Sequence, residues 1–348
     1  MKTASTTAIF RTITVIFVNI LVLAALLLVV EHILQQLDPR NSLPFDGIRE
    51  GVRYTWGHRV TNNEFGFRER DISIPKPTET FRVMVLGDSL TWGAGVAQAE
   101  RYTEVAEQLL RDRHPDRRIE ILNFGVPGGP TTQYREIANK YATQIDADLL
   151  VVGFCINDTQ PRPQNYSPER EAFIQQYAPA FRAIRLYSKL APRTAENLEQ
   201  LLFAIGEATK MFPPWWDALD RTYQTHSPEW RAFEGALAGI RQLSEQQFLP
   251  PPVFLVLELG TSSSAPTDYR DENDEMLNRF RRWHAKAKAA AKDAGFRVFD
   301  HEQAFRDELA GQVLAANPLD GHPSPQQHHI YARSLVQAVS EAWHLRRQ

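Results

Sequence analysis

Residues 83–90 restrict the fold of this chain more than any other segment. Val83–Leu86 are four apolar residues, a pattern typical of a short buried strand, and they run directly into a tight Gly-Asp turn. Ser89 lies at that turn, and a helical pattern follows from about Glu100 to Leu110. A serine at the carboxyl end of a strand, ahead of a helix, stands where open α/β sheets bind ligands. Such a nucleophile needs a base and an oxyanion site from elsewhere in the chain.

Strand and helix patterns alternate from Phe81 onward. The expected strands are Arg82–Leu86, Ile119–Asn123, Leu149–Phe154, Val253–Leu257 and Phe296–Phe299. The expected helices are Glu100–Arg111, Thr132–Gln144, Arg231–Gln247, Glu272–Ala294 and a final one over Gln326–Leu345. Strands that alternate with helices of this length predict an α/β fold, with a five-stranded parallel sheet in a three-layer α/β/α sandwich.

The connection between the third and fourth expected strands is much longer than a simple crossover requires. We therefore expect a helical insertion over 161–252 within a domain that spans 81–348. Its apolar patterns predict helices over Pro168–Leu190 and Thr194–Met211. Trp215 and Trp216 have two interpretations that the sequence does not separate. They either form a wall of a substrate cleft or pack in a small core of the insertion itself.

The N-terminal part of the chain predicts a membrane anchor. Thr12 to Val30 contains no charged residue. At ~1.5 Å per residue in a helix this segment is roughly 28 Å long, close to the thickness of a bilayer's hydrocarbon core. Lys2 and Arg11 precede it and Glu31 follows it. The positive-inside rule then puts the N-terminus in the cytoplasm and the bulk of the chain outside.

A cleaved signal peptide is the alternative for this segment. Its apolar region would be shorter and would end at small residues. Here the leucines and valines continue into Glu31–Leu34 without such a site. We therefore expect a cytoplasmic segment over 1–11, a transmembrane helix over 12–37, and a linker and N-terminal arm over 38–80. The protein would be a single-pass protein of the cell inner membrane, with its catalytic domain on the periplasmic (extracytoplasmic) side.

Composition excludes several other classes of protein. The formal net charge of -3 gives no support for a nucleic-acid partner. Cys155 is the only cysteine, so no intramolecular disulfide can form. His328 and His329 are adjacent and cannot share a helix face as zinc ligands do. No Walker or Rossmann glycine pattern occurs either, so we expect neither a metal nor a cofactor.

Three further segments supply polar groups at the positions where a catalytic serine needs them. A glycine-rich turn over Asn123–Pro130 follows the second expected strand and lets backbone N–H groups approach a ligand. Asn157 follows the third strand, and its amide can donate to a developing oxyanion. Asp320 and His322 precede the final helix, and a histidine beside a carboxylate can act as a general base.

This set of motifs resembles the SGNH hydrolases, also called the GDSL lipase/esterase family, from about Phe81 to the C-terminus. The resemblance implies a flavodoxin-like SGNH fold. Gly87-Asp88-Ser89-Leu90 matches the first block of the family, which makes Ser89 the expected nucleophile and its N–H an oxyanion donor. The second block assigns the oxyanion glycine to Gly128, and the third assigns the side-chain donor to Asn157.

The last block of the resemblance assigns the general base to His322 and its acid partner to Asp320. Two positions depart from the family pattern. Cys155 stands where the third block usually has glycine, and the acid–base spacing is D-x-H instead of D-x-x-H. The shorter turn leaves Asp300, at the end of the fifth expected strand, as an alternative partner for the histidine.

The expected function is that of a serine esterase acting on acyl esters, O-acetyl esters above all, outside the cytoplasmic membrane. A membrane-tethered domain of this type resembles enzymes that act on cell-surface polysaccharides. The alternatives are an O-acyltransferase that uses the same serine, a lipid or lysophospholipid hydrolase, and a non-catalytic tethered polysaccharide-binding or scaffold protein. The expected partners are an acyl-ester substrate and the membrane, and the sequence leaves the oligomeric state open.

Overall fold

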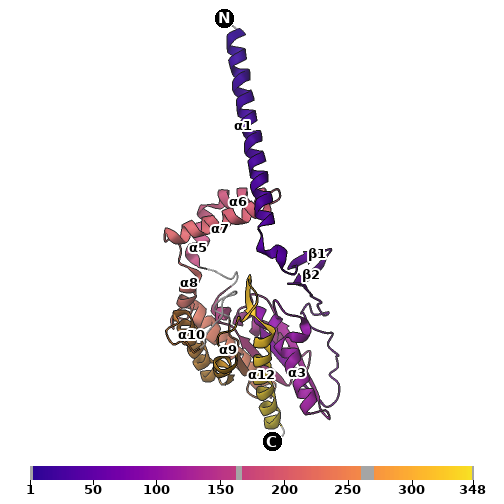
Figure 1. Ribbon diagram of the computed structural model, residues 1–348. Helices are drawn as coiled ribbons and strands as arrows, with labels where there is room; N and C mark the ends of the chain where they lie inside the picture. The colour runs from indigo at the N-terminus through magenta and orange to yellow at the C-terminus, as the bar shows by residue number, and fades with distance from the viewer. Residues whose placement is uncertain (1–2, 162–166, 260–269, 347–348) are drawn as a thin grey trace. The chain divides into compact units, whose positions relative to one another are not determined.

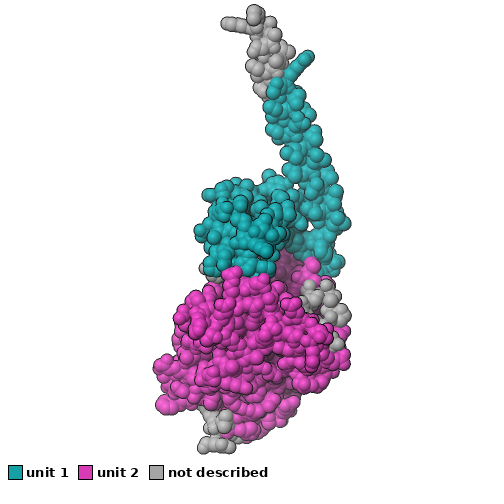
Figure 2. Space-filling model, turned by 90° about the vertical axis from the view of Figure 1, so that its left-hand side faces the viewer, with its two compact units in different colours: residues 1–43, 167–214 teal, residues 44–166, 215–348 magenta. Residues whose placement is uncertain are grey.

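The computed structural model describes residues 3–161, 167–259 and 270–346. The chain forms two compact units (Figure 2). Residues 44–166 and 215–348 make up the larger one, which we call the sheet unit. Residues 1–43 and 167–214 make up the smaller one, which we call the helical unit. Each unit is described by itself.

A five-stranded parallel sheet forms the centre of the sheet unit. Its strands lie in the order β5-β4-β6-β7-β8. They are β4 (Thr80–Gly87), β5 (Arg118–Gly125), β6 (Leu149–Phe154), β7 (Val253–Val256) and β8 (Arg297–Phe299). All five correspond to strands expected from the sequence, because continuous runs of buried apolar residues are the pattern of a sheet covered on both faces.

Helices cover both faces of this sheet (Figure 1). α3 (Tyr102–Arg113) packs against α12 (Pro325–Arg346). α4 (Thr131–Tyr141) packs against α9 (Pro228–Gln246), and α9 contacts α10 (Glu275–Asp293). The three-layer α/β/α architecture expected from the sequence is thereby confirmed.

The chain reverses its direction of winding at β4. The next strand, β5, pairs with one edge of β4, and the following strand, β6, pairs with the other. The carboxyl end of β4 therefore lies at the switch point, where open α/β sheets bind ligands. All eight residues of β4 are buried. Gly87 is the last residue of the strand, and a side chain there would overlap that of Thr91, so the position requires glycine.

Short elements connect the main ones or carry the residues considered below. They are α2 (Ser89–Trp92), η2 (Gln98–Glu100), η3 (Ile156–Thr159), α8 (Trp215–Thr222), α11 (Glu302–Ala304), η4 (Phe305–Leu309), β9 (Ala315–Asn317) and β10 (Asp320–Pro323). The helix expected to start near Glu100 is α3, and α2 is an additional short helix that begins at Ser89 itself. The N-terminal arm starts as a small antiparallel sheet of β1 (Gly47–Arg49), β2 (Val52–Thr55) and β3 (His58–Arg59).

The helical unit contains α1 (Thr3–Gln36), η1 (Pro39–Ser42), α5 (Pro168–Gln176), α6 (Ala178–Tyr187) and α7 (Pro192–Ala208). Its small core consists of Phe173, Phe181 and Phe212. The single helix expected over Pro168–Leu190 is in fact two helices, α5 and α6. The helix breaks at Tyr177 because Pro179 has no N–H to donate to the Gln175 carbonyl oxygen, as a continuous helix would require.

The first helix, α1, is long and apolar enough to cross a membrane. A signal sequence near an N-terminus can pass the same test of length and composition, so this property alone does not separate the two. The expected insertion over 161–252 contributes to both units, since α8 and α9 belong to the sheet unit. Trp215 and Trp216 pack against the hydrophobic core of the sheet unit, and neither lines the cavity described below. The pair therefore does not pack in a small core of the insertion itself, because Trp216 contacts Phe280 and Trp283 of α10, and the substrate-cleft interpretation stays a prediction.

Candidate active site

Ser89 lies directly after the buried end of β4, as the first residue of α2. Asp88 caps this short helix, because its carboxylate accepts a hydrogen bond from the Leu90 N–H at 2.9 Å. Ser89 is 7% exposed, and its hydroxyl donates to Asp88 Oδ2 at 3.4 Å. Burial raises the pKa of Asp88. The backbone thus holds Ser89 at a fixed place at the carboxyl end of β4.

His322 lies on the hairpin formed by β9 and β10. Asp320, two residues earlier, accepts hydrogen bonds at Oδ1 from the backbone N–H of His322, at 3.0 Å, and from the ring Nδ1. Burial lowers the pKa of His322, but the adjacent Asp320 carboxylate outweighs it, and the net direction is upward. The imidazolium form, which a general base becomes when it takes a proton, is therefore stabilised here.

Trp56 holds the other oxygen of the same carboxylate. Its indole Nε1 donates to Asp320 Oδ2 at 2.5 Å. Both oxygens of Asp320 are thus engaged, one by the histidine and one by a residue of the N-terminal arm. Sequence reasoning missed this contact because 264 residues separate the partners and no local pattern marks an indole as a donor to a distant carboxylate.

A cavity of about 430 Å³ joins these groups. Ser89, Gly128, Asp320 and His322 all line it. In the part of the chain that the structure describes, no hydrogen bond joins Ser89 to His322, because the serine hydroxyl points to Asp88. Rotation of the serine side chain can turn its hydroxyl into the shared cavity. Catalytic hydrogen bonds are often long in the absence of substrate and tighten when substrate binds.

The other two expected oxyanion residues, Gly128 and Asn157, occupy different positions. Gly128 lies on the cavity wall with a φ of +67°, a backbone conformation that favours glycine. Asn157 is not among the residues that line the cavity; it is 8% exposed, and its side chain is hydrogen-bonded to the Asp88 carboxylate. An amide nitrogen carries two protons, so this bond leaves a second proton for an oxyanion near Ser89.

Buried polar groups link the glycine-rich turn to the third block. Tyr134 Oη lies 2.8 Å from the Gly129 carbonyl oxygen and 2.7 Å from Asp158 Oδ1. Burial raises the pKa of Asp158 well above its ordinary value. The Tyr134 hydroxyl is thus within hydrogen-bonding distance of both the Gly129 carbonyl oxygen and the Asp158 carboxyl group. These hydrogen bonds fix the position of the turn that carries Gly128.

Cys155 and Asp300 complete the expected residues. The Cys155 thiol is fully buried, and burial raises its pKa well above the ordinary value. Its backbone N–H donates to Asp158 Oδ2 at 3.1 Å, so cysteine fits where the family pattern has glycine. Asp300 pairs with Lys288 at 2.7 Å, whereas Asp320 contacts the histidine. The D-x-H spacing therefore still brings an acid to the imidazole.

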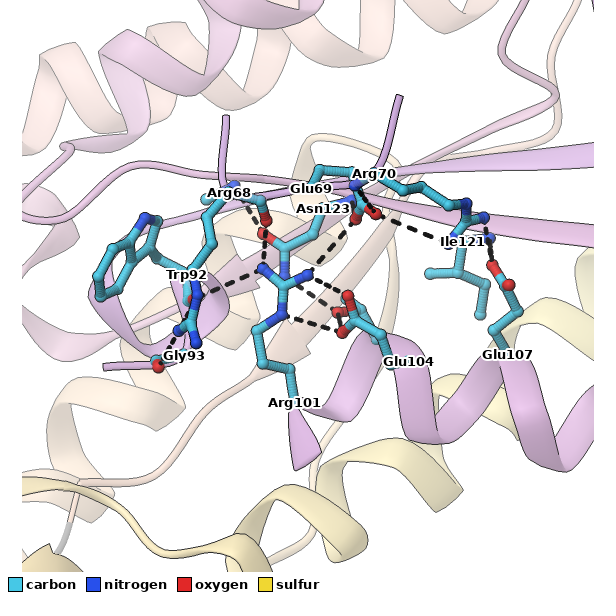
Figure 3. Close-up of polar contacts among 12 residues, drawn as sticks. Arg68, Glu69, Arg70, Trp92, Gly93, Arg101, Glu104, Glu107, Ile121 and Asn123 are labelled. Atoms are coloured by element: carbon cyan, nitrogen blue, oxygen red, sulfur yellow. Dashed lines mark hydrogen bonds and ion pairs between the residues drawn. The ribbon is translucent and has the colours of Figure 1, made fainter. Parts of the chain in front are cut away.

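A buried charge network ties the N-terminal arm to the serine turn (Figure 3). Arg68 donates to the carbonyl oxygens of Gly93, at 2.6 Å, and Val96, at 2.9 Å, just after α2. Glu69 accepts from the backbone N–H of Asn123 in β5 at 2.8 Å. Arg101 lies between them and pairs with Glu69 at 3.6 Å. These contacts hold the segment that follows Ser89 in place.

The sequence of the sheet unit decides the family. The model of the GDSL-like lipase/acylhydrolase family matches residues 85–330. The chain belongs to this family. The GDSL acylhydrolase is accordingly an ester hydrolase, and the matched region includes Ser89, Gly128, Asn157, Asp320 and His322. The described residues contain no group of three histidine, cysteine, aspartate or glutamate side chains arranged to hold a metal ion.

Several solved structures are similar to this GDSL acylhydrolase at low sequence identity. An acetyl xylan esterase matches with 14% identity and a TM-score of 0.43, over 74% of this chain and 100% of its own. An acetylxylan esterase from Geobacillus stearothermophilus matches with 15% identity and a TM-score of 0.42, over 74% and 93%. An alpha/beta hydrolase enzyme from the metagenome of Lake Arreo matches with 15% identity and a TM-score of 0.42, over 75% and 95%. A search of curated proteins finds no match.

Proposed function

We propose that this acylhydrolase is a membrane-anchored serine esterase that removes short acyl groups, O-acetyl above all, from a polysaccharide outside the cytoplasmic membrane. Ser89 is the proposed nucleophile, His322 the general base and Asp320 its partner. The observation that carries the proposal is the Asp320–His322 pair, which faces the same cavity as Ser89.

In the proposed reaction His322 takes the Ser89 proton while the serine oxygen attacks the ester carbonyl carbon. The N–H groups of Ser89 and Gly128 and the amide of Asn157 stabilise the resulting oxyanion. The carbon–oxygen bond to the alcohol then breaks, and His322 returns the proton to the leaving alcohol. Water attacks the acyl-enzyme in the same way and releases the carboxylic acid.

The cavity favours a small acyl group on a polar alcohol. Its lining includes the polar residues Asp46, Arg53 and Thr55 beside the aromatic rings of Tyr54 and Trp92. A long acyl chain would need a deep apolar channel to leave water. Aromatic rings next to polar groups instead suit a sugar, which presents both C–H faces and hydroxyls.

Membrane anchoring by α1 is the second part of the proposal. The apolar segment continues into Glu31–Leu34 without a small-residue cleavage site, which favours an anchor over a cleaved signal. Lys2 and Arg11 at its start favour a cytoplasmic N-terminus. A protease added to intact spheroplasts is expected to cut the catalytic part of the full-length chain. Full protection of that part would contradict the proposed orientation.

The esterase is tested with the full chain in detergent, on p-nitrophenyl acetate and on an O-acetylated polysaccharide. Ser89→Ala is expected to abolish release of acetate and labelling by a fluorophosphonate probe. Ser188→Ala, in the helical unit, is the matched control and should retain both. Unchanged turnover in Ser89→Ala would eliminate Ser89 as the nucleophile. Transfer of the acetyl group to another glycan, without free acetate, would identify an acyltransferase instead.

A further inference from the structure

Five exposed apolar side chains lie on α6, on α7 and on the connection between them. Leu198, Leu201 and Ile205 lie on α7, and their spacing of three and four residues puts them on one side of the helix. Leu186 is the next-to-last residue of α6, and Leu190 lies between α6 and α7; they are 67% and 76% exposed. We refer to these five side chains as the apolar ridge.

The unit's own core does not use the apolar ridge. Leu202 and Phe203, also on α7, pack against the small phenylalanine core instead. α7 therefore carries some apolar side chains that the core covers and others that it leaves exposed. Exposed apolar surface of this kind usually marks contact with a partner or a membrane.

Polar contacts hold the start of α7 against α1. The Glu31 carboxylate accepts hydrogen bonds from the backbone N–H groups of Arg193, at 3.1 Å, and Thr194, at 2.8 Å. Asp38 pairs with Arg193 at 2.7 Å. Glu31 is the first charged residue after the apolar stretch. The start of α7 is therefore fixed where the apolar part of α1 ends, and Figure 1 shows α7 running across this end of α1.

The apolar ridge continues the face of α7 that touches α1. Thr194 bonds to Glu31, and Leu198 lies four residues later, one helical turn along the same side. The rest of the ridge extends beyond this contact. If α1 crosses a bilayer, the ridge lies where acyl chains meet headgroups.

The charges nearby suit the same surface. Arg182, Arg185 and Lys189, on α6 and just after it, are exposed, and no acidic residue occurs between residues 172 and 195; the acidic residues of α7 are Glu196, Glu199 and Glu207. Helices that lie in a membrane interface combine a row of leucines with basic residues on the polar side. Basic side chains near a membrane are attracted to anionic headgroups.

We propose that α6 and α7 bind the surface of the bilayer that α1 crosses. The apolar ridge enters the acyl-chain boundary, and the three basic side chains contact anionic phospholipid headgroups. This inference rests on the proposed transmembrane role of α1. The helical unit then acts as a second membrane contact beside the span.

The test uses the full chain reconstituted in vesicles of phosphatidylethanolamine and phosphatidylglycerol that contain a bromine-labelled acyl chain as quencher. Fluorophores are attached in the single variants Leu190→Cys and Leu201→Cys. Leu23→Cys, within α1, reports on the span, and Phe248→Cys, 94% exposed in the sheet unit, serves as the solvent control. The native Cys155 is buried, so the unaltered chain is the labelling blank.

We expect quenching at positions 190 and 201 to exceed quenching at position 248 by at least about twofold, and to decrease when phosphatidylglycerol is replaced by phosphatidylcholine. Quenching at position 23 with none at 190 and 201 would overturn the inference and leave the anchor standing. Absence of quenching at position 23 would overturn the anchor and the inference together. Protection of positions 190 and 201 from water without quenching would indicate a second copy of the chain and also overturn the inference.

Discussion

The two sides of the candidate active site are held in place by different kinds of structure. Ser89 follows β4, an interior strand of the sheet that is buried along its whole length and pairs with a neighbour on each edge. His322 lies on a two-stranded hairpin with an irregular register, and its side chain is 29% exposed. A buried sheet opens only with the whole domain, whereas a short surface hairpin can open by itself.

Side-chain contacts hold this short hairpin in place. Asp320 holds the imidazole, and Trp56 from the arm holds Asp320. On the serine side the arm contributes Arg68, which binds carbonyl oxygens after α2. The arm thus supports both sides, but with different consequences. We expect changes on the serine side to affect folding, and changes on the histidine side to affect catalysis and its pH dependence.

The largest effect is expected where the two sides meet. Ser89→Ala and His322→Ala should each lower kcat by on the order of 10⁴-fold to 10⁶-fold, and the double variant should be little worse, because the two groups act as one unit. Steady-state kinetics on p-nitrophenyl acetate measures this. If the fold-losses in kcat of the two single variants multiply in the double variant, the two residues do not act in one reaction step. The two sides of the site would then not form one catalytic unit.

Asp320→Asn is expected to lower kcat by roughly 10³-fold to 10⁴-fold, since the histidine loses the group that orients it. The pH dependence should change as well. The general base must be neutral, so in the unaltered enzyme activity falls as the pH drops through the raised pKa of His322. Removing the carboxylate charge lowers that pKa, and the acidic limb of the kcat/KM profile should move to lower pH. An unmoved limb would assign it to another group. Asp300→Asn is the control and should leave the limb in place.

Arg68→Met tests the serine side. The buried guanidinium satisfies several carbonyl oxygens, and its removal leaves them without a partner. The free energy of unfolding should fall by about 3 kcal/mol, measured as a lower midpoint in urea. The molecules that remain folded should keep the pH profile of the parent enzyme. A shifted pH profile with unchanged stability would reverse the expected division between the two sides.

Trp56→Phe tests the histidine side and should have the smallest effect of the four. Losing one hydrogen bond to a carboxylate costs about 1.5–3 kcal/mol, so kcat should fall roughly 10-fold to 100-fold. The acidic limb should move to higher pH, because Asp320 becomes a stronger acceptor for the imidazolium. Trp283→Phe removes a similar indole–carboxylate bond, to Asp220 at 2.7 Å, away from the cavity. A shift of the limb in that control would contradict a local role of Trp56.

Much of the sheet was predictable because its pattern is local. Four apolar residues before a Gly-Asp turn mark β4, and similar runs mark the other strands. The break between α5 and α6 was missed, since the helical pattern continues through Tyr177 and only the proline geometry interrupts it. The environment of Trp215 and Trp216 was also missed. The core that an aromatic pair joins depends on helices distant in the sequence. Here Trp216 packs on Phe280 and Trp283 of α10.

The sequence alone determined the α/β class, the family and the positions of Ser89, Gly128, Asn157, Asp320 and His322 at the ends of elements, because these features are written in short segments. Only the tertiary structure decided which acid meets His322 and which arm residue meets that acid. The physical reason is reach: a carboxylate or an indole acts over a few ångströms, and that proximity arises only when segments hundreds of residues apart pack together.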